Sequence, residues 1–402
     1  MARNVEIAIL GGGCAGLSLA KTLALANPPF EVVVLEERAT YLDDRTWSGW
    51  ATEPHAFADC VRKRWSRWRV STDRGRYETA GGKIAYESIA ARAFYASARR
   101  AIDAAPRIDL LTGVSVADVE ARGDGATIAL ANGERIEAEW VIDTIPRGRV
   151  LTYPWMWQSF VGFEIECPGA GGDDIPELMD FRVPQLGGAT FLYTLPFAPN
   201  RALFELTCFS ADRTNERDLQ RTLLRLLARR FPGGFRHVRN EHAHLPMSPS
   251  DRRPNGRVVP AGTTGGAMRP ATGFAFHAIQ RWASHCASEL CAGRPPSVAT
   301  THPALLWMDR IFMSIINDEP EAAPALYARL FSGANPDGLV RFLAGTPHVL
   351  DIASVVAALP LAKFTRAAAR ASGLRAPDPV ASLRWSETQA SRCRRSRSQT
   401  AM

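Results

Sequence analysis

Glycines near the N-terminus carry the clearest chemistry of this 402-residue sequence. The apolar segment 5–10 leads into Gly11, Gly13 and Gly16, and Glu36 ends the next apolar segment. In a dinucleotide-binding turn of this spacing, the first glycine allows a tight turn, the second lets the backbone approach a pyrophosphate, and the third lets a helix pack on a strand. An acid at Glu36 accepts a ribose hydroxyl and disfavours a 2′-phosphate, so NAD or FAD fits better than NADP. The alternative is an ordinary glycine-rich turn.

Glu205 is a second residue with distinctive chemistry, because its surroundings are unusual for a carboxylate. In the strand expected at 202–209, both alternating faces are apolar, which predicts that the side chain is buried. Burial raises the pKa of a carboxyl group, so this acid is expected to stay protonated near neutral pH and to donate a proton. The alternative is a structural ion pair with Arg201 or Arg182.

The elements that must position these residues follow from hydrophobic periodicity and turn residues. The N-terminal segment predicts a strand–helix–strand unit, with the helix at 17–26 and the second strand at 31–35. Further elements are predicted as a helix at 86–104, strands at 126–130 and 135–142 around an Asn132–Gly133 turn, a helix at 215–231, a strand at 258–261 before a glycine-rich turn at 262–266, a helix at 274–290, and a helical region at 303–372.

Aromatic and β-branched residues between 158 and 210 predict an antiparallel sheet that covers the cofactor site. Its strands are expected at 160–166, 190–195 and 202–209. Glu164 and Glu166 alternate with apolar residues, so they are expected on a solvated strand face. The densely apolar stretch 305–316 favours a core helix over a membrane-facing surface.

Composition indicates an ordinary globular protein, with 46% apolar and 22% charged residues, enough for two to three domains. Part of the net charge of +7 lies in a C-terminal segment, which is expected to be a disordered basic tail with attraction to anionic lipid as the lesser alternative. No motif for nucleic acid accompanies the basic residues. The arginines of this segment are Arg392, Arg394, Arg395 and Arg397.

The cysteines and the apolar runs indicate the compartment. Seven cysteines are scattered without CxxC pairs, a reduced and metal-free pattern. No signal-peptide pattern opens the sequence, and no apolar run reaches the ~18 to 20 residues of a membrane span. We therefore expect a protein on the cytoplasmic side, either in the cytosol or bound to a membrane surface. The cysteines are Cys14, Cys60, Cys167, Cys208, Cys286, Cys291 and Cys393.

Asp43, Asp44 and Arg45, followed by Thr46 and Trp47, form a DDRTW run. Alone, such a run is compatible with a surface turn and a local ion pair. It resembles, however, the DDRTW signature of bacterial lycopene β-cyclases, and further segments in the same order resemble that family across about residues 5–320. These segments are 158–162, 179–181, 191–196 (FLYTLP), 203–210 around Glu205, and 265–274 (GGAMRPATGF). The sequence departs from the family pattern at Ser48, Gly49, Leu206 and Phe274.

The resemblance implies an α/β fold with a glutathione-reductase-type FAD-binding domain, in which helices flank a parallel sheet. An antiparallel-sheet substrate domain is inserted and a helical C-terminal part follows. The domains expected on this basis are residues 1–150 with 245–300 for FAD, 151–244 for substrate, 301–375 for the helical region and 376–402 for the tail.

The resemblance also implies a reaction: cyclisation of the linear ends of lycopene to β-ionone rings, giving γ-carotene and β-carotene without net electron transfer. Glu205 would be the general acid, returning as base or assisted by Asp180. Reduced FAD would stabilise the carbocation, with NAD(P)H a possible external reductant. Aromatic faces would help by cation–π attraction. The aromatic candidates are Trp47, Trp50, Phe160, Phe191 and Tyr193.

Further site residues follow from the same resemblance. Asp43, Asp44 and Arg45 are placed at the flavin or at the mouth of a substrate tunnel. Gly262, Gly265 and Gly266 would form a second cofactor contact, with the backbone N–H groups of Gly265, Gly266 and Ala267 facing the reduced ring. Because lycopene is insoluble, the protein is expected to attach peripherally to a membrane, where other carotenoid-pathway enzymes are possible partners.

Two alternative functions stay open from the sequence. One is a related FAD-dependent monooxygenase or carotenoid reductase that consumes NAD(P)H. The other is a non-catalytic flavin- or carotenoid-binding protein.

Overall fold

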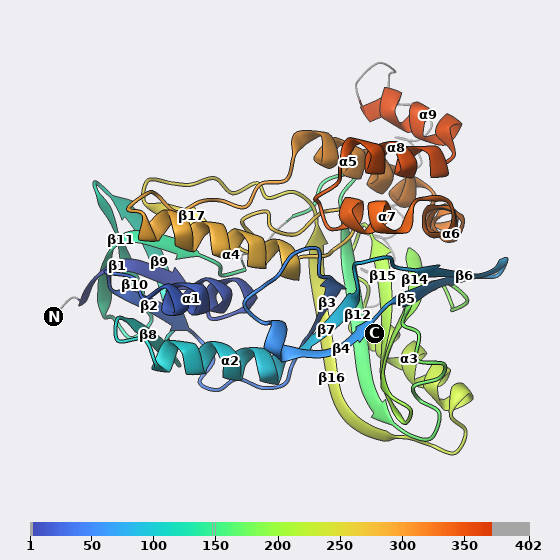
Figure 1. Cartoon of the computed structure of the whole chain (residues 1–402), viewed down its shortest axis with the longest axis horizontal. Coiled ribbons are helices and arrows are strands. Elements are labelled where there is room, and N and C mark those ends of the chain that lie inside the picture. The colour runs from blue at the N-terminus through green and yellow to red at the C-terminus, as the bar shows by residue number, and fades with distance from the viewer. Residues whose placement is uncertain (1–2, 147, 149, 372–402) are drawn as a thin grey trace, which may run out of the picture. The chain divides into compact units, whose positions relative to one another are not determined.

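The computed structural model describes residues 3–146, 148 and 150–371 (Figure 1). The predicted basic tail at 376–402, with Cys393, lies outside the described residues. The chain divides into one compact unit that ends at Leu359 and a second that begins at Pro360. In the second unit the structure describes one helix, α9 (Leu361–Ala371), which is treated by itself.

The N-terminal half of the first unit is built on a sheet with strand order β8-β2-β1-β11-β10-β9, in which β17 also pairs with β11. Strands β8, β2, β1, β11 and β17 run parallel, whereas β9, β10 and β11 form antiparallel hairpins. The predicted strand–helix–strand opening and the hairpin at Gly133 are confirmed. The strands are β1 (Arg3–Leu10), β2 (Val32–Glu36), β8 (Ile108–Thr112), β9 (Val116–Arg122), β10 (Gly125–Leu130), β11 (Arg135–Asp143) and β17 (Val258–Pro260).

Three helices cover one face of this sheet, as Figure 1 shows at the left. They are α1 (Cys14–Ala26), α2 (Ala91–Asp103) and α4 (Phe276–Cys291). Their apolar faces share one core with β1 and β2, in which Leu19, Phe94 and Ala283 are fully buried. This packing brings the segment after β17 back to the first turn of α1, although nearly 250 residues separate them in sequence.

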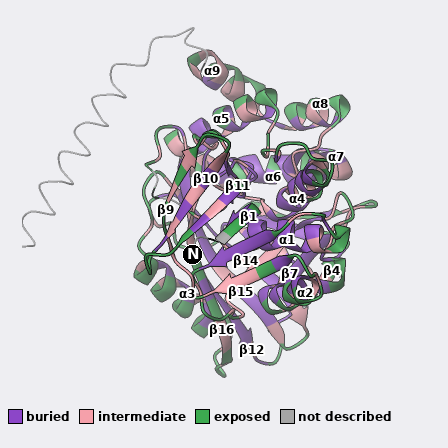
Figure 2. Cartoon of the chain, turned by 90° about the vertical axis from the view of Figure 1, so that its left-hand side faces the viewer, coloured by how far each residue is buried: buried purple, intermediate pink, exposed green. Residues whose placement is uncertain are grey.

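A second sheet has the order β16-β12-β15-β14-β13-β5-β6, and all of its pairs are antiparallel except β13 with β5. Helix α3 (Glu216–Arg230) packs on one face through Leu219, Leu223 and Leu227. The predicted strands and helix of this region are confirmed, and Figure 2 shows its long strands β12 and β16 mostly buried or intermediate. The strands are β5 (Arg67–Thr72), β6 (Gly75–Ala80), β12 (Met156–Glu166), β13 (Glu177–Asp180), β14 (Ala189–Ala198), β15 (Arg201–Ser210) and β16 (Arg236–Met247).

A small third sheet corrects the helix predicted at 86–104. Residues Tyr86–Ala90 form strand β7, which pairs with β3 (Thr46–Trp50) and β4 (Val61–Trp65), and the helix begins only at Ala91. Alanine and arginine content favoured a helix throughout, but Tyr86 and Ile89 are buried by pairing with strands far along the chain. A short 3-10 turn, Ala58–Cys60, precedes β4.

Helices make up the rest of the first unit, as predicted for this region. They are α5 (Pro303–Asp318), α6 (Ala323–Gly333), α7 (Pro336–Leu343) and α8 (Val349–Ala358), with a 3-10 turn at Pro320–Ala322. Ile311, Met313 and Ile316 of α5 are buried, which supports the core interpretation of 305–316. Within the described residues no single helix is long and apolar enough to cross a membrane; only α8 taken together with α9 meets that test, by length and composition.

Candidate functional site

The glycine turn after β1 leaves room at the N-terminus of α1. Gly11 has a φ of +92°, and a Cβ on Gly16 would lie 1.9 Å from the carbonyl oxygen of Gly11, so both positions require glycine. A Cβ on Gly13 would instead meet nothing within 4 Å. Helix α1 has no side-chain cap and no acidic residue in its first turn. Open space beside uncapped N–H groups, at the positive end of a helix dipole, fits a pyrophosphate.

Glu36 lies under the same turn. Its side chain accepts a hydrogen bond from the Gly12 backbone N–H (2.7 Å) and one from Arg38 Nε (2.7 Å). Burial opposes ionisation, but Arg38 and the Gly12 N–H outweigh it and hold the pKa of Glu36 below its usual range. Glu36 is therefore an anion that shapes the turn, and its contact with a ribose hydroxyl stays a prediction.

The second glycine turn lies against the first. A Cβ on Gly262 would come 2.8 Å from Ala15 Cβ, which places this turn at the first turn of α1. The N–H groups of Gly265, Gly266 and Ala267 donate to carbonyls of Ala261, Thr263 and Gly262 within the same turn. Hydrogen bonds inside the turn already use these N–H groups, so the structure does not support the expectation that they face a flavin ring. Their position beside α1 remains compatible with a cofactor contact.

The three charged residues of the DDRTW run lie between α1 and α2. Asp43 accepts a hydrogen bond from the Arg92 N–H (3.1 Å) and so caps α2, and Asp44 accepts one from the Tyr95 hydroxyl (3.2 Å). Burial raises the pKa of the thiol of Cys14, the first residue of α1. Arg45 lies close enough to this thiol to offset part of that rise. Arg45 therefore adds positive charge at the N-terminus of α1, where a pyrophosphate would bind.

Glu205 lies in β15, in a row of residues that crosses four strands. Its cross-strand partners are Tyr193 of β14 and Gly162 of β12, and Gly162 in turn pairs with Glu241 of β16. The side chain accepts a hydrogen bond from Thr207 Oγ1 (2.8 Å). Burial, together with the neighbouring Glu241, raises the pKa of Glu205 to about 8. The side chain is half-buried rather than fully buried as predicted, and these surroundings support the prediction that Glu205 is protonated near neutral pH.

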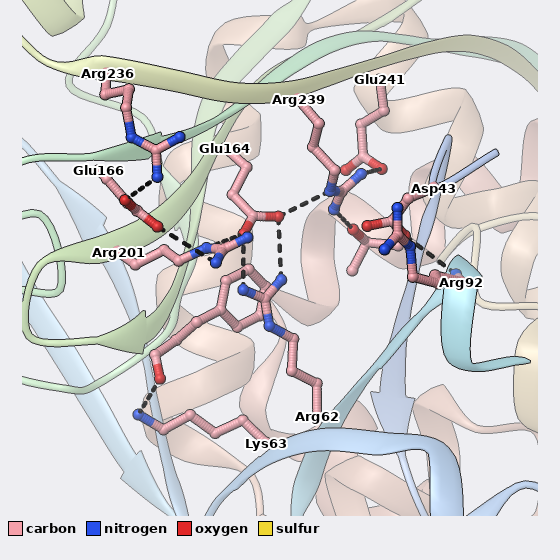
Figure 3. Close-up of polar contacts among 12 residues, drawn as sticks. Asp43, Arg62, Lys63, Arg92, Glu164, Glu166, Arg201, Arg236, Arg239 and Glu241 are labelled. Atoms are coloured by element: carbon pink, nitrogen blue, oxygen red, sulfur yellow. Dashed lines mark hydrogen bonds and ion pairs between the residues drawn. The ribbon is translucent and has the colours of Figure 1, made fainter.

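Glu241 and Arg239 of β16 belong to this site, and the sequence reasoning missed both. Arg239 Nη1 lies 3.0 Å from Glu241 Oε2, and both side chains contact the side chain of Thr46. Because Thr46 belongs to the DDRTW run, these contacts link that run to Glu241, whose charge acts on Glu205. Figure 3 shows the ion pair of Arg239 with Glu241. Glu241 is 6% exposed, and burial raises its pKa while Arg239 opposes that rise.

Asp180 is not brought to Glu205. It pairs with Leu192, and Leu192 pairs with Leu206, the residue next to Glu205. Because paired residues share a face and neighbours along a strand alternate, Asp180 and Glu205 lie on opposite faces of the sheet. Asp180 instead forms an ion pair with Arg182 (2.8 Å). The expected assistance of Glu205 by Asp180 therefore has no structural support.

Glu164 corrects a second expectation, because it is fully buried rather than solvated. Its carboxylate accepts hydrogen bonds from Arg62 (2.7 Å), Arg201 (2.5 Å) and Arg239 (2.8 Å), as Figure 3 shows. These arginines outweigh the effect of burial and lower the pKa of Glu164 to about 2. Since Arg201 pairs with Glu164, and Arg182 with Asp180, neither arginine is the ion-pair partner considered for Glu205.

Aromatic side chains lie on one side of Glu205. Tyr193 lies beside Glu205, and its hydroxyl shares a hydrogen bond with that of Tyr86 (2.8 Å). Trp50 packs edge-on against Tyr86 and Phe274, with ring centroids 5.0 and 5.1 Å apart. This arrangement gives the site an apolar lining of the kind that excludes water and stabilises a cation.

A buried His–Glu–His cluster lies at the edge of this aromatic group. His55 Nε2 and His277 Nε2 contact Glu87 Oε1 at 2.6 and 3.0 Å. His55 Nδ1 accepts a hydrogen bond from the Phe57 N–H, so its Nε2 carries the proton and has no lone pair for a metal. A Cβ on Gly49 would lie 2.9 Å from His277 Nδ1, so His277 leaves little room for a side chain at this position.

Comparison with known proteins decides the family. The model of the lycopene cyclase protein family matches residues 6–369. The chain belongs to the lycopene cyclase family. It is 28% identical over 388 residues to a lycopene beta-cyclase of Paracoccus sp., covering 88% of this chain and 94% of that protein. It is 23% identical to a lycopene beta-cyclase of Pantoea ananas, covering 90% and 96%.

Solved structures confirm the fold of this lycopene cyclase family member. A geranylgeranyl bacteriochlorophyll reductase-like protein from Thermoplasma acidophilum has a TM-score of 0.58 at 13% identity, covering 91% of this chain and 99% of that one. The p-nitrophenol 4-monooxygenase of Pseudomonas putida has a TM-score of 0.57 at 16% identity, covering 90% and 98%. The predicted glutathione-reductase-type FAD fold, with parallel and antiparallel sheets and C-terminal helices, is therefore confirmed.

Proposed function

We propose that this protein is a lycopene β-cyclase that closes β-ionone rings at the ends of lycopene by acid–base chemistry. One observation carries the proposal: Glu205, a half-buried acid with a pKa of about 8, lies in one polar cluster with the DDRTW run, which adjoins the dinucleotide-type turn. An acid that is protonated at neutral pH, in aromatic surroundings, suits proton transfer to an alkene.

FAD is the cofactor that the site fits. The turn at Gly11, Gly13 and Gly16 would hold its pyrophosphate, Arg45 would add positive charge, and the turn at 262–266 would lie alongside. When bound in its reduced form, FAD supplies negative charge that stabilises a nearby carbocation. NAD(P)H is the proposed external source of the reducing electrons.

The residues of the chain supply the proton steps. Glu205 donates its proton to the terminal double bond, a ring C–C bond forms, and a ring carbon returns a proton to the Glu205 carboxylate. Thr207 Oγ1 holds the carboxyl group in place through the bond of 2.8 Å. Tyr193, Tyr86 and Trp50 exclude water, which would otherwise trap the cation as an alcohol. Atoms balance, because substrate and product are isomers.

The direct test supplies lycopene in phospholipid vesicles with reduced FAD. We expect γ-carotene or β-carotene with the mass of lycopene, and we expect the protein to sediment with the vesicles. Exposed Val349 and Leu350 on α8, each 82% accessible, and Trp307 on α5 support this membrane contact. A product of altered mass, with NAD(P)H consumed, would instead indicate a monooxygenase or reductase, and unchanged lycopene a non-catalytic binding protein.

Gly13→Ala tests the cofactor site separately from folding. The new methyl group meets no protein atom within 4 Å, and Gly13 already has an ordinary φ of −81°, so the thermal midpoint should stay within a few degrees of wild type. The methyl group would occupy the space proposed for the pyrophosphate, so we expect at least about a tenfold loss of FAD affinity by fluorescence titration. Full FAD binding by a folded Gly13→Ala protein would contradict the assignment.

A further inference from the structure

Two carboxylates, the half-buried Glu205 and the buried Glu241, flank Gly162, which has no side chain to separate them. Both are cross-strand partners of Gly162, one from each neighbouring strand. A Cβ on Gly162 would lie 3.4 Å from Glu205 Cβ and 3.2 Å from Glu241 Cγ. A larger residue there would push the two side chains apart, so glycine permits the approach.

The two carboxylates have different partners. Glu241 forms an ion pair with Arg239 at 3.0 Å, whereas the hydrogen bond found for Glu205 comes from the neutral hydroxyl of Thr207 at 2.8 Å. Two nearby carboxylates in an apolar site do not both ionise readily, and a cation on one of them decides which keeps the proton. Arg239 therefore favours the charge on Glu241 and leaves the proton on Glu205.

The other titratable groups around Glu205 do not change this assignment. Tyr193 of β14 and Tyr86 of β7 face it, and burial raises the pKa of both phenols, so they remain neutral. From β16, Glu241 and Arg239 are the charged groups that act on Glu205. Arg239 is itself shared with Glu164, a buried anion that holds the guanidinium in place at 2.8 Å.

We propose that Glu241 is a positioning residue, held ionised by Arg239, whose negative charge keeps Glu205 protonated at the pH at which the enzyme works. This inference rests on the proposed function, because it assigns Glu241 a part in preparing the general acid. Glu241 does not touch the reacting alkene in this assignment. It acts through the charge state of Glu205.

Glu241→Gln tests the proposal, because it removes the charge and preserves the shape. Loss of a like charge lowers the pKa of Glu205, so the alkaline limb of the kcat–pH profile should move to lower pH by about one unit or more. Turnover below the new midpoint should stay near wild type. Glu241→Asp retains the charge and should restore most of the original midpoint. Glu166→Gln, made in the same arginine network but away from Glu205, is the matched control and should leave the profile unchanged.

Infrared difference titration of the FAD-loaded protein without substrate gives a readout independent of activity. Wild type minus Glu205→Gln should show one protonated carboxyl band at neutral pH, and Glu241→Gln should lower the midpoint of that band. An unchanged midpoint would overturn the proposal. So would a folded, FAD-loaded Glu241→Gln protein that is inactive at every pH, because Glu241 would then take part in the chemistry itself. If the band behaves as expected but wild type forms no cyclic carotene, the proposed function fails and the carboxylate pair stands.

Discussion

Glu205→Gln is expected to lower kcat for lycopene cyclisation by about 10²- to 10⁴-fold, the contribution typical of general acid catalysis. Glutamine matches the size of the side chain and still accepts the hydrogen bond from Thr207, but it has no acidic proton. The measurement is single-turnover formation of cyclic carotene with reduced FAD, followed by chromatography. The FAD content should match wild type, because Glu205 lies outside the glycine turns.

Asp180→Asn is the informative comparison for this variant. Asp180 lies on the opposite face of the sheet from Glu205 and pairs with Arg182, so its amide variant should keep most of the turnover. A large loss in Asp180→Asn, with turnover retained in Glu205→Gln, would show that the acid has been misassigned.

Much of the fold could be predicted from local sequence patterns. The strand–helix–strand opening and the strands of the second sheet could be predicted because each has its own periodicity. Strand β7 could not, since Tyr86–Ala90 runs directly into the alanine-rich α2 and becomes a strand only by pairing with β3 and β4. Long-range pairing of this kind has no local signal.

The site shows the same division between local and long-range information. Glu205 was identifiable because its own strand is apolar on both faces, whereas Glu241 lies in a strand that is polar along most of its length. Its position next to Glu205 depends on the register of both strands against Gly162. For Glu164, the alternation of polar and apolar residues predicted the face of the strand correctly. It could not predict that Arg62 of β4, from a distant part of the chain, covers this face and buries the carboxylate.

Glu164→Gln is expected to destabilise the fold more than the other substitutions considered, by about 3–5 kcal/mol. The substitution keeps the size of the side chain, so no cavity arises. It removes a fully buried anion that binds Arg62, Arg201 and Arg239, and Arg239, 10% exposed, is left with less compensating charge. Urea unfolding at pH 7 measures the change. The exposed ion pair of Glu120 with Arg122 provides the control, since Glu120→Gln should cost no more than about 1 kcal/mol.

The loss of stability at low pH is a second test of the same ion cluster, because the lowered pKa of Glu164 fixes the direction of the change. The arginines lower the pKa of Glu164 from 4.5 to about 2, so the folded state binds fewer protons than the unfolded state between these values. This contribution is complete above about pH 4.5 and is lost as the pH falls towards 2. Wild type should therefore lose more stability than Glu164→Gln between pH 5 and about 3. Parallel acid dependence in both proteins would show that other carboxylates control acid unfolding, and that the Glu164 cluster is weaker than its three arginine contacts indicate.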